Sequence, residues 1–395
     1  MQTPLATAIV FVYTLSGITV LGLLALFALK LRNLSAEKQA RMCEEKYRDY
    51  FVYLQAYGEE EERLKVPYGE VTQKEKQLIQ KKLFELMERF TGVHRQKLIQ
   101  LCEDMGLVAH DLERLRSGWK WTRVDAAYNL GVMRSGQAAP DLLVLLQKSG
   151  ANDPSLFIFA RAIAKCARDA EDLRQMAEYV VRMKKNVHQL IVDMISDSQL
   201  DTTSFYTEWI RDKNPELVKI GLIGFAVHAQ LELEPGLSRL ALSADKEVRI
   251  KAVKLMCRDI RYLNDQTIKD FLNHKDWEIR ALIVKAIGAM QLADYVPALK
   301  KAVGDANWWV RHHSARSLTQ LQAKGFSALC DILREEGSNP KSEMAQQIIQ
   351  EELEKAERSL GGEPSTEKLL DYNEKLHLYR KSCKKTISTV QAMEG

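Results

Sequence analysis

The short motifs that mark most enzyme and cofactor sites are missing from this 395-residue sequence. It has no glycine-rich phosphate loop of the Walker or Rossmann type, no Gly-x-Ser-x-Gly elbow and no His-Glu-x-x-His zinc motif. Its six cysteines are widely separated, with no Cys-x-x-Cys pair, which favours buried free thiols in a reducing compartment over disulfides. We therefore expect no enzyme activity, no cofactor and no metal, although a carboxylate pair assembled by folding leaves no such signature.

Strand signals and strong net charge are scarce as well. No Asn-Gly turn and no sustained alternation of apolar and polar residues accompanies the hydrophobic runs, so the sequence predicts an all-α fold. The formal net charge is only +4, whereas nucleic-acid-binding proteins usually concentrate basic residues on one face. Binding to nucleic acid is therefore not expected.

What the sequence does contain is a pattern with a fixed period. Similar segments begin at Asn214, Asp245, Asp276 and Asn307, which are 31 residues apart three times in succession. Asp and Asn are good N-terminal helix caps, because their side-chain oxygen accepts a hydrogen bond from a free amide of the first turn. A second break, often at a proline, divides each unit into helix, short loop and helix. A period of this size is typical of a solenoid, whose units cannot bury their apolar faces alone.

The pattern also extends towards the N-terminus at looser intervals. Earlier copies begin at Trp119, Asp153 and Asn186, at spacings of 34, 33 and 28 residues. About seven copies are therefore expected over residues 119–336. The copy from Asn186 is the least regular, because Asp193 stands where the other units have a mostly small residue.

These units resemble HEAT-like repeats. The resemblance rests on the Val/Ile-Arg-x-x-Ala pattern after an Asp or Asn cap, as in Asp245-Lys-Glu-Val-Arg249. The period fits the short bacterial kind, including the repeats of phycobilin lyases, better than the 40–47 residues of longer HEAT units. The resemblance covers somewhat over half of the chain and implies a right-handed HEAT-like α-solenoid with helical caps.

The N-terminus carries a long apolar stretch. Leu5 to Leu29 includes no charged residue, and 25 helical residues span about 37 Å, enough to cross a hydrocarbon core of about 30 Å. Lys30, Arg32, Lys38 and Arg41 follow directly, which predicts a short N-terminus outside and a cytoplasmic remainder. A cell-membrane, single-pass anchor is favoured, with a cleaved signal peptide and a buried core helix as the alternatives.

The rest of the chain divides by composition. We expect five segments: a transmembrane anchor and basic flank (1–33), a juxtamembrane helix and acidic linker (34–71), an N-terminal helical cap (72–118), the repeats (119–336), and C-terminal capping helices with a tail (337–395). Thr72 and Glu75 have the spacing of a capping box that opens the N-terminal cap. Asn339-Pro340 has the cap-plus-proline signature that opens the C-terminal helices.

Two groups of residues are candidate sites. The first is a periodic ladder, in which each arginine contacts acids or helix ends of the neighbouring repeat; a basic ridge for phosphate or an acidic partner is the alternative. Its members are Asp245, Arg249, Asp276, Arg280, Asn307 and Arg311. The second is a candidate partner-binding cluster rich in the residue types of protein–protein hot spots, with one tryptophan expected in the core. Its members are Trp308, Trp309, Arg311, His312 and His313.

Together these features predict a membrane-tethered scaffold or adaptor whose cytoplasmic solenoid binds a protein. The arrangement resembles bacterial membrane-anchored HEAT-repeat proteins, which implies a membrane glycosyltransferase of envelope or exopolysaccharide synthesis as the partner. A lyase-like maturation enzyme and a nucleic-acid-binding solenoid are the alternatives. A bound visible chromophore would indicate the former, and steeply salt-dependent DNA binding the latter.

Overall fold

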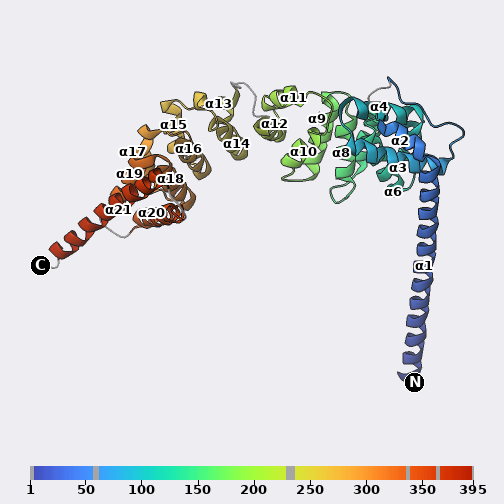
Figure 1. Ribbon diagram of the computed structural model, residues 1–395, viewed down its shortest axis with the longest axis horizontal. Coiled ribbons are helices and arrows are strands. Elements are labelled where there is room, and N and C mark those ends of the chain that lie inside the picture. The colour runs from blue at the N-terminus through green and yellow to red at the C-terminus, as the bar shows by residue number, and fades with distance from the viewer. Residues whose placement is uncertain (1–3, 57–61, 228–235, 335–338, 362–364, 394–395) are drawn as a thin grey trace. The chain divides into compact units, whose positions relative to one another are not determined.

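The computed structural model describes residues 4–56, 62–227, 236–334, 339–361 and 365–393, with side chains described within 11–382 except at Ala36. Within these ranges every regular element is a helix and no strand occurs, which confirms the all-α fold (Figure 1). The chain divides into two compact units, Met1–Lys185 with Met194–Leu200, and Asn186–Asp193 with Asp201–Gly395. Each unit is described by itself.

The first unit begins with the apolar helix and continues through a cap into the first repeats. Its helices are α1 (Pro4–Lys46), α2 (Arg48–Ala56), α3 (Gln73–Arg89), α4 (Gly92–Asp104), α5 (Leu107–Leu115), α6 (Lys120–Val132), the 3-10 turn η1 (Gly136–Ala138), α7 (Ala139–Lys148), α8 (Leu156–Cys166) and α9 (Ala170–Met183).

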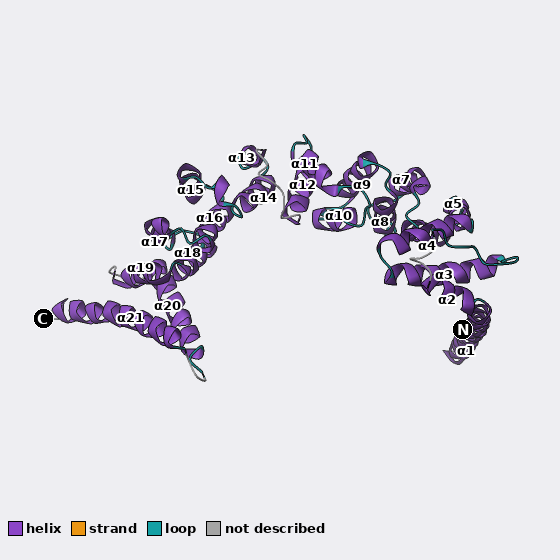
Figure 2. Cartoon of the chain, turned by 45° about the horizontal axis from the view of Figure 1, so that its top comes forward, coloured by secondary structure: helices purple, strands orange, loops and turns teal. Residues whose placement is uncertain are grey.

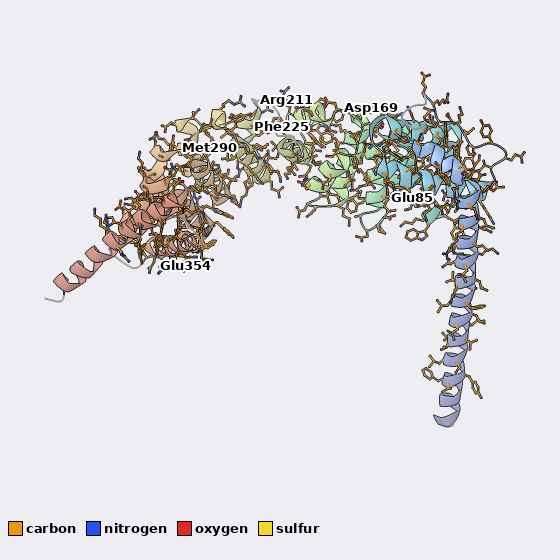
Figure 3. All side chains as sticks on the ribbon, in the orientation of Figure 1. Glu85, Asp169, Arg211, Phe225, Met290 and Glu354 are labelled. Carbon is orange, nitrogen blue, oxygen red and sulfur yellow. The ribbon has the colours of Figure 1, made fainter. Side chains whose placement is uncertain are left out.

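Helix α1 joins the apolar stretch to the folded part of the first unit without a break. The side chains of residues 11–35 are all exposed (Figure 3), and the helix is long and apolar enough to cross a membrane. Its other end packs into the unit, since Cys43 is buried, as are Tyr47 and Phe51 just beyond. Ion pairs from Lys46 Nζ to Glu75 Oε1 (2.6 Å) and from Lys82 Nζ to Glu44 Oε1 (3.2 Å) fasten α1 to α3.

The cap helices follow their sequence signals. Thr72 accepts a hydrogen bond from the backbone of Glu75, and the Glu75 side chain accepts one from the Thr72 backbone, so the expected capping box is confirmed. The Lys46 ammonium, then the Thr72 backbone and hydroxyl, lower the pKa of Glu75 to about 2. The expected acidic linker contains four consecutive glutamates at 59–62, of which only Glu62 is among the described residues.

The second unit holds the regular repeats and the C-terminal helices. Its helices are α10 (His188–Ile195, which crosses the boundary between the units), α11 (Thr202–Ile210), α12 (Pro215–Val227), α13 (Gly236–Leu240), α14 (Lys246–Met256), η2 (Ile260–Tyr262), α15 (Asp265–Leu272), α16 (Trp277–Ala289), η3 (Ala293–Tyr295), α17 (Val296–Ala302), α18 (Trp308–Gln320), α19 (Gln322–Arg334), α20 (Pro340–Arg358) and α21 (Thr366–Met393).

These helices form two rows. In Figure 2, α12, α14, α16 and α18 follow one another in one row, and α13, α15 and α17 lie in the other, each packed on its partner. Helices α14, α16 and α18 begin at Lys246, Trp277 and Trp308, which reproduces the 31-residue period. Equivalent positions are buried in each of them: Val248, Ile279 and Val310, and four residues later Ala252, Ile283 and Ser314. The period thus reflects one apolar face repeated along the row.

Two expected helix starts are wrong. Asn186 has a left-handed backbone (φ 59°), and α10 begins only at His188. Helix α8 begins at Leu156 rather than next to Asp153, because the Asp153 carboxylate accepts hydrogen bonds from the backbone and hydroxyl of Ser155 and closes a turn ahead of the helix. Asp193 is exposed and therefore tolerated in the irregular repeat.

The C-terminal helices cover the last repeat. Asn339 caps α20 through Lys341 and Ser342, as the Asn-Pro signature predicts. Met344, Ile348 and Ile349 are buried in the apolar core shared with α18 and α19. Helix α21 packs on α19 and α20, and its side chains from residue 383 onward lie outside the described ones.

Candidate functional site

The Trp308 cluster is a surface group on the first two turns of α18. The indole of Trp308 stacks on the imidazole of His312 (centroids 4.9 Å apart), and that of Trp309 stacks on His313 (5.8 Å). The two indoles contact each other edge to face at 4.8 Å. Trp308 is 44% exposed and Trp309 50%, so the expectation that one of them lies in the core is wrong. Val310, between Trp309 and Arg311, provides the core contact instead.

Partial burial keeps both histidines of this cluster in the neutral form. Desolvation lowers the pKa of His312, with a further contribution from the nearby Arg316 guanidinium. Desolvation also lowers the pKa of His313, helped by the Lys285 ammonium. The imidazoles and indoles at the start of α18 therefore form an amphipathic patch in which Arg311 carries the charge at neutral pH.

The candidate ladder residues link successive repeats, although not all of them pair in the expected way. Arg249 Nη2 lies 2.6 Å from Asp276 Oδ2, the residue that opens the next helix of its row. The Arg249 guanidinium is the main cause of the lowered pKa of Asp276. Asp276 therefore forms no side-chain cap of its own helix.

The next two arginines differ from each other. Arg280 pairs with Asp305 (2.8 Å), an acid at the junction with the next repeat, as the ladder predicts. Asn307 instead caps α18 by accepting a hydrogen bond from the Trp309 backbone. Arg311 donates to the Asp305 and Ala306 carbonyls.

One contact of these arginines is common to both units. Nη1 of each donates to the carbonyls six and five residues earlier, which closes the loop ahead of its own helix. The pairs are Ser117 and Gly118 for Arg123, Ser243 and Ala244 for Arg249, His274 and Lys275 for Arg280, and Asp305 and Ala306 for Arg311. These arginines therefore stabilise the loops ahead of their helices, and their guanidinium groups already have hydrogen-bond acceptors within the fold.

Asp245 is linked to the preceding repeat by a lysine that the sequence reasoning missed. Lys219 is 7% exposed and lies 2.8 Å from Glu216 and 3.1 Å from Asp245. It takes this role because Val218 occupies the arginine position of its repeat. Asp245 also accepts from the backbones of Glu247 and Val248 and so caps α14.

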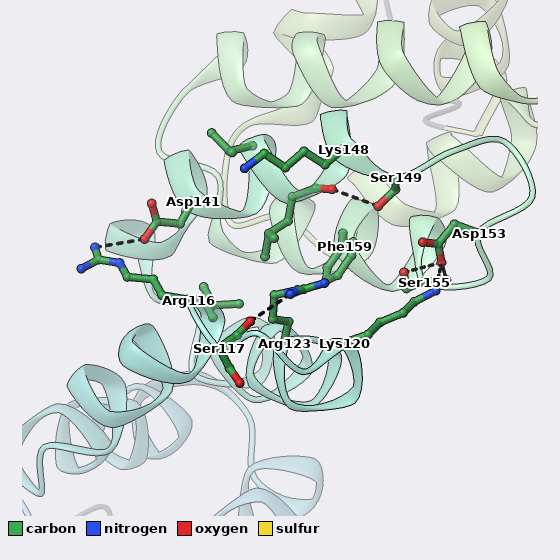
Figure 4. Close-up of a pocket in the computed structure, with 13 residues that line it drawn as sticks. Arg116, Ser117, Lys120, Arg123, Asp141, Lys148, Ser149, Asp153, Ser155 and Phe159 are labelled. Atoms are coloured by element: carbon green, nitrogen blue, oxygen red, sulfur yellow. Dashed lines mark hydrogen bonds and ion pairs between the residues drawn. The ribbon is translucent and has the colours of Figure 1, made fainter.

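A hollow of the first unit lies between α6, α7 and α8 (Figure 4). Its charged side chains mostly pair with one another, since Arg116 contacts Asp141 (3.3 Å) and Lys120 contacts Asp153 (2.8 Å). Hydrogen bonds from Lys120 and then Ser155 lower the pKa of Asp153 to about 2. The lining therefore has four cations (Arg116, Lys120, Arg123 and Lys148) against two acids, and both acids are paired across the junction between repeats.

A hollow of the second unit differs in its charge. It crosses α14, α16 and α18, holds about 450 Å³, and no carboxylate is among the described residues that line it. Its lining consists of Lys254, Cys257, Arg258, Leu282, Lys285, Ala286, Ala289, His313, Arg316, Ser317 and Gln320. We refer to these residues as the cationic groove.

Three cations of the groove recur with the repeat. Lys254, Lys285 and Arg316 are 31 residues apart, each five residues after an arginine of the ladder. The sequence reasoning missed this column because it followed the cap and the arginine positions only. The same period, read five residues further on, would have revealed it.

The described residues contain no group of three or more His, Cys, Asp or Glu side chains arranged to hold a metal ion. The cysteines within the described side chains are free, and all are buried except the half-buried Cys257. Burial raises the pKa of Cys166 and of Cys257 to about 12. These thiols are therefore protonated packing groups at neutral pH.

Comparison with known proteins identifies the repeats. Residues 231–319 and 264–349 match the model of the family described as HEAT repeats. This part of the chain, which includes the cationic groove and the Trp308 cluster, is therefore built of HEAT repeats. None of the curated proteins compared with the sequence matches it.

Several solved structures are similar in fold at low identity. YibA of Escherichia coli is 14% identical, with 65% of this chain and 99% of that chain covered and a TM-score of 0.33. Importin beta is 13% identical, with 84% and 54% covered and a TM-score of 0.34. The complex of CpcE and CpcF of phycocyanin lyase from Nostoc sp. is 13% identical, with 70% and 94% covered and a TM-score of 0.24. Likenesses of this degree carry no conclusion about function.

Proposed function

We propose that this protein is a membrane-tethered scaffold whose HEAT-repeat solenoid binds a protein partner on the cytoplasmic side. The observation that carries the proposal is the construction of α1, whose described apolar side chains from Phe11 to Leu29 are all exposed while its other end packs into the first unit. An exposed apolar surface of this size is unfavourable in water and is typical of a segment that a membrane or a partner covers.

The anchor and the folded unit share one helix, which limits how they move relative to each other. From Leu29, the end of the apolar stretch, to Cys43, the first buried residue, 14 residues of helix span about 21 Å. The side chains at Lys30, Arg32, Lys38 and Arg41 are exposed or nearly so in this segment. Basic residues beside an apolar span favour the cytoplasmic side, which supports the proposed orientation.

The interactions of the ladder arginines and of the two surface groups support a scaffold rather than an enzyme. The ladder arginines bond to loop carbonyls and to carboxylates of their own or the next repeat. The surface groups left over, the Trp308 cluster and the cationic groove, are of the types that bind other molecules. Solenoids mainly supply such extended binding surfaces.

We propose a membrane glycosyltransferase of envelope or exopolysaccharide synthesis as the partner, on the basis of the resemblance to bacterial membrane-anchored HEAT-repeat proteins. Tethering would serve such a partner because it confines both proteins to one surface and raises their effective concentration without new contacts.

Co-purification from cells tests the proposal. The full-length chain is cross-linked in cells, extracted in mild detergent and compared by mass spectrometry with a chain that carries residues 1–46 alone. A membrane protein enriched with the full-length chain over the anchor is the expected result. Recovery of the full-length chain in the soluble fraction, or the same proteins with both chains, would refute it.

A further inference from the structure

The cationic groove carries positive charge that the fold does not neutralise. Lys254 and Lys285 are exposed, and the described contacts give neither of them an acceptor or an ion-pair partner. Arg258 donates to the Ala226 carbonyl (2.6 Å), and Arg316 pairs with Glu351 on α20. Two free cations and two partly engaged ones therefore face a hollow without a carboxylate, which favours an anionic occupant.

The spacing of the cations follows the spacing of the helices. Lys254, Lys285 and Arg316 occupy equivalent positions on α14, α16 and α18, which pack next to one another. Packed helices lie about 8–10 Å apart, so the column presents one cation at each such interval. An extended polyproline-II segment advances about 9 Å every three residues and returns to the same face, so it could place one acid opposite each cation.

The floor of the groove is apolar, which distinguishes it from a surface suited to phosphates alone. This floor consists of the apolar lining residues of α16, Leu282, Ala286 and Ala289, of which Leu282 and Ala289 are not buried. His313 lines the groove and stacks on Trp309, which is half exposed. A ligand with alternating acidic and apolar groups could therefore contact both the cations and the apolar residues of the groove.

We propose that the cationic groove binds an extended acidic segment of a protein partner, with an acidic residue at about every third position and apolar residues between. The inference rests on the proposed scaffold function and names the chemistry of its ligand. Lys254 and Lys285 supply the principal charge, Leu282 and Ala289 the apolar contact, and Trp309 with His313 an aromatic edge.

Peptide binding to the full-length chain in an uncharged detergent tests the proposal. The probe is a labelled peptide of repeated Glu-Pro-Ala triplets, and its Gln-Pro-Ala counterpart is the uncharged reference. We expect the glutamate peptide to bind, with an affinity that falls as salt is added, because salt screens exposed charges. Lys254→Glu with Lys285→Glu should weaken binding by about tenfold or more, since attraction becomes repulsion.

The matched control reverses two exposed lysines that do not line the groove, Lys301→Glu on α17 with Lys324→Glu on α19, and should leave binding unchanged. Lys254→Gln with Lys285→Gln should give an intermediate loss. Equal binding by the groove variant and the control would overturn the proposal. Tighter binding of phosphatidylglycerol vesicles or single-stranded DNA, lost in the groove variant, would also overturn it by assigning the groove to phosphates.

Cross-linking in cells separates this inference from the scaffold function. If wild type and the Lys254→Glu, Lys285→Glu variant capture the same membrane protein equally, the groove assignment fails and the scaffold stands. If wild type captures no membrane protein, the scaffold function fails. Binding of the glutamate peptide then still tests whether the groove accepts an acidic segment.

Discussion

The guanidinium of Arg249 and the carboxylate of Asp276 join one repeat to the next at 2.6 Å, with only 9% and 13% of their side chains exposed. The same guanidinium holds the Ser243 and Ala244 carbonyls ahead of its own helix. One side chain therefore fixes both a loop and the junction between two repeats.

Arg249→Ala should lower the free energy of unfolding by about 2–4 kcal/mol, because it leaves the Asp276 carboxylate and two carbonyls without their donor. Chemical denaturation of the full-length chain in detergent measures the effect. The control is Arg358→Ala, whose partner Glu354 is 3.1 Å away in an exposed pair (77% and 64%) worth about 0.5 kcal/mol or less. Equal losses for the two variants would show that Arg249 does not clamp the repeats.

Ala252→Asp should destabilise the second unit by several kcal/mol, since Ala252 is fully buried and the new carboxylate has no partner there. Lys254→Asp, two residues away on the same helix but exposed, should change the free energy of unfolding by less than about 0.5 kcal/mol. Thermal melts of both variants provide the measurement. A parental melting temperature for Ala252→Asp would mean that the apolar face of the repeat is wrongly placed.

Acid should weaken the start of α18. Because burial lowers the pKa values of His312 and His313 in the folded chain, the unfolded chain binds protons more readily. Their contribution to stability is therefore complete above the ordinary histidine value of about 6.5 and is lost as pH falls through the lowered values. His312→Gln with His313→Gln should reduce the difference in unfolding midpoint between pH 8 and pH 5.5. If the difference between the two midpoints is the same in this variant, these histidines do not cause the loss of stability in acid.

The membrane topology is testable by cysteine labelling, although not at the native Cys43, which is only 6% exposed and whose pKa burial raises. In a Cys383→Ser background, an impermeant maleimide should label Gln2→Cys in intact cells. It should label Glu37→Cys, at an exposed position of α1, only after permeabilisation. The reverse pattern would invert the proposed orientation.

The sequence predicted the fold well where one physical requirement repeats. A cap, a clamp and an apolar face recur together from Asp245 to Asn307, and α14, α16 and α18 start at the expected positions. Prediction failed where a single contact decides the outcome. Asp153 closes a turn instead of capping, and Arg311 bonds carbonyls of its own loop instead of the next repeat, because only the folded loop shows which oxygen is within reach.

The candidate site was predicted less well than the fold. Trp308 and Trp309 were recognisable by residue type, but their exposure depends on where Val310 enters the core. Lys254, Lys285 and Arg316 were visible in the sequence as a periodic column. That they line one hollow without a carboxylate required the packing of three helices.

Photo-cross-linking from the cationic groove in living cells tests the tethered scaffold most directly. Benzoylphenylalanine replaces Ala289, an exposed residue of the groove floor, in the full-length chain, and Lys301 on α17 serves as the control position. We predict an adduct with a membrane-associated protein from position 289, formed through an acidic segment, absent from position 301 and lost when residues 1–33 are removed. The same adduct without the anchor would contradict the tethered scaffold, whereas no adduct from position 289 would contradict the groove assignment.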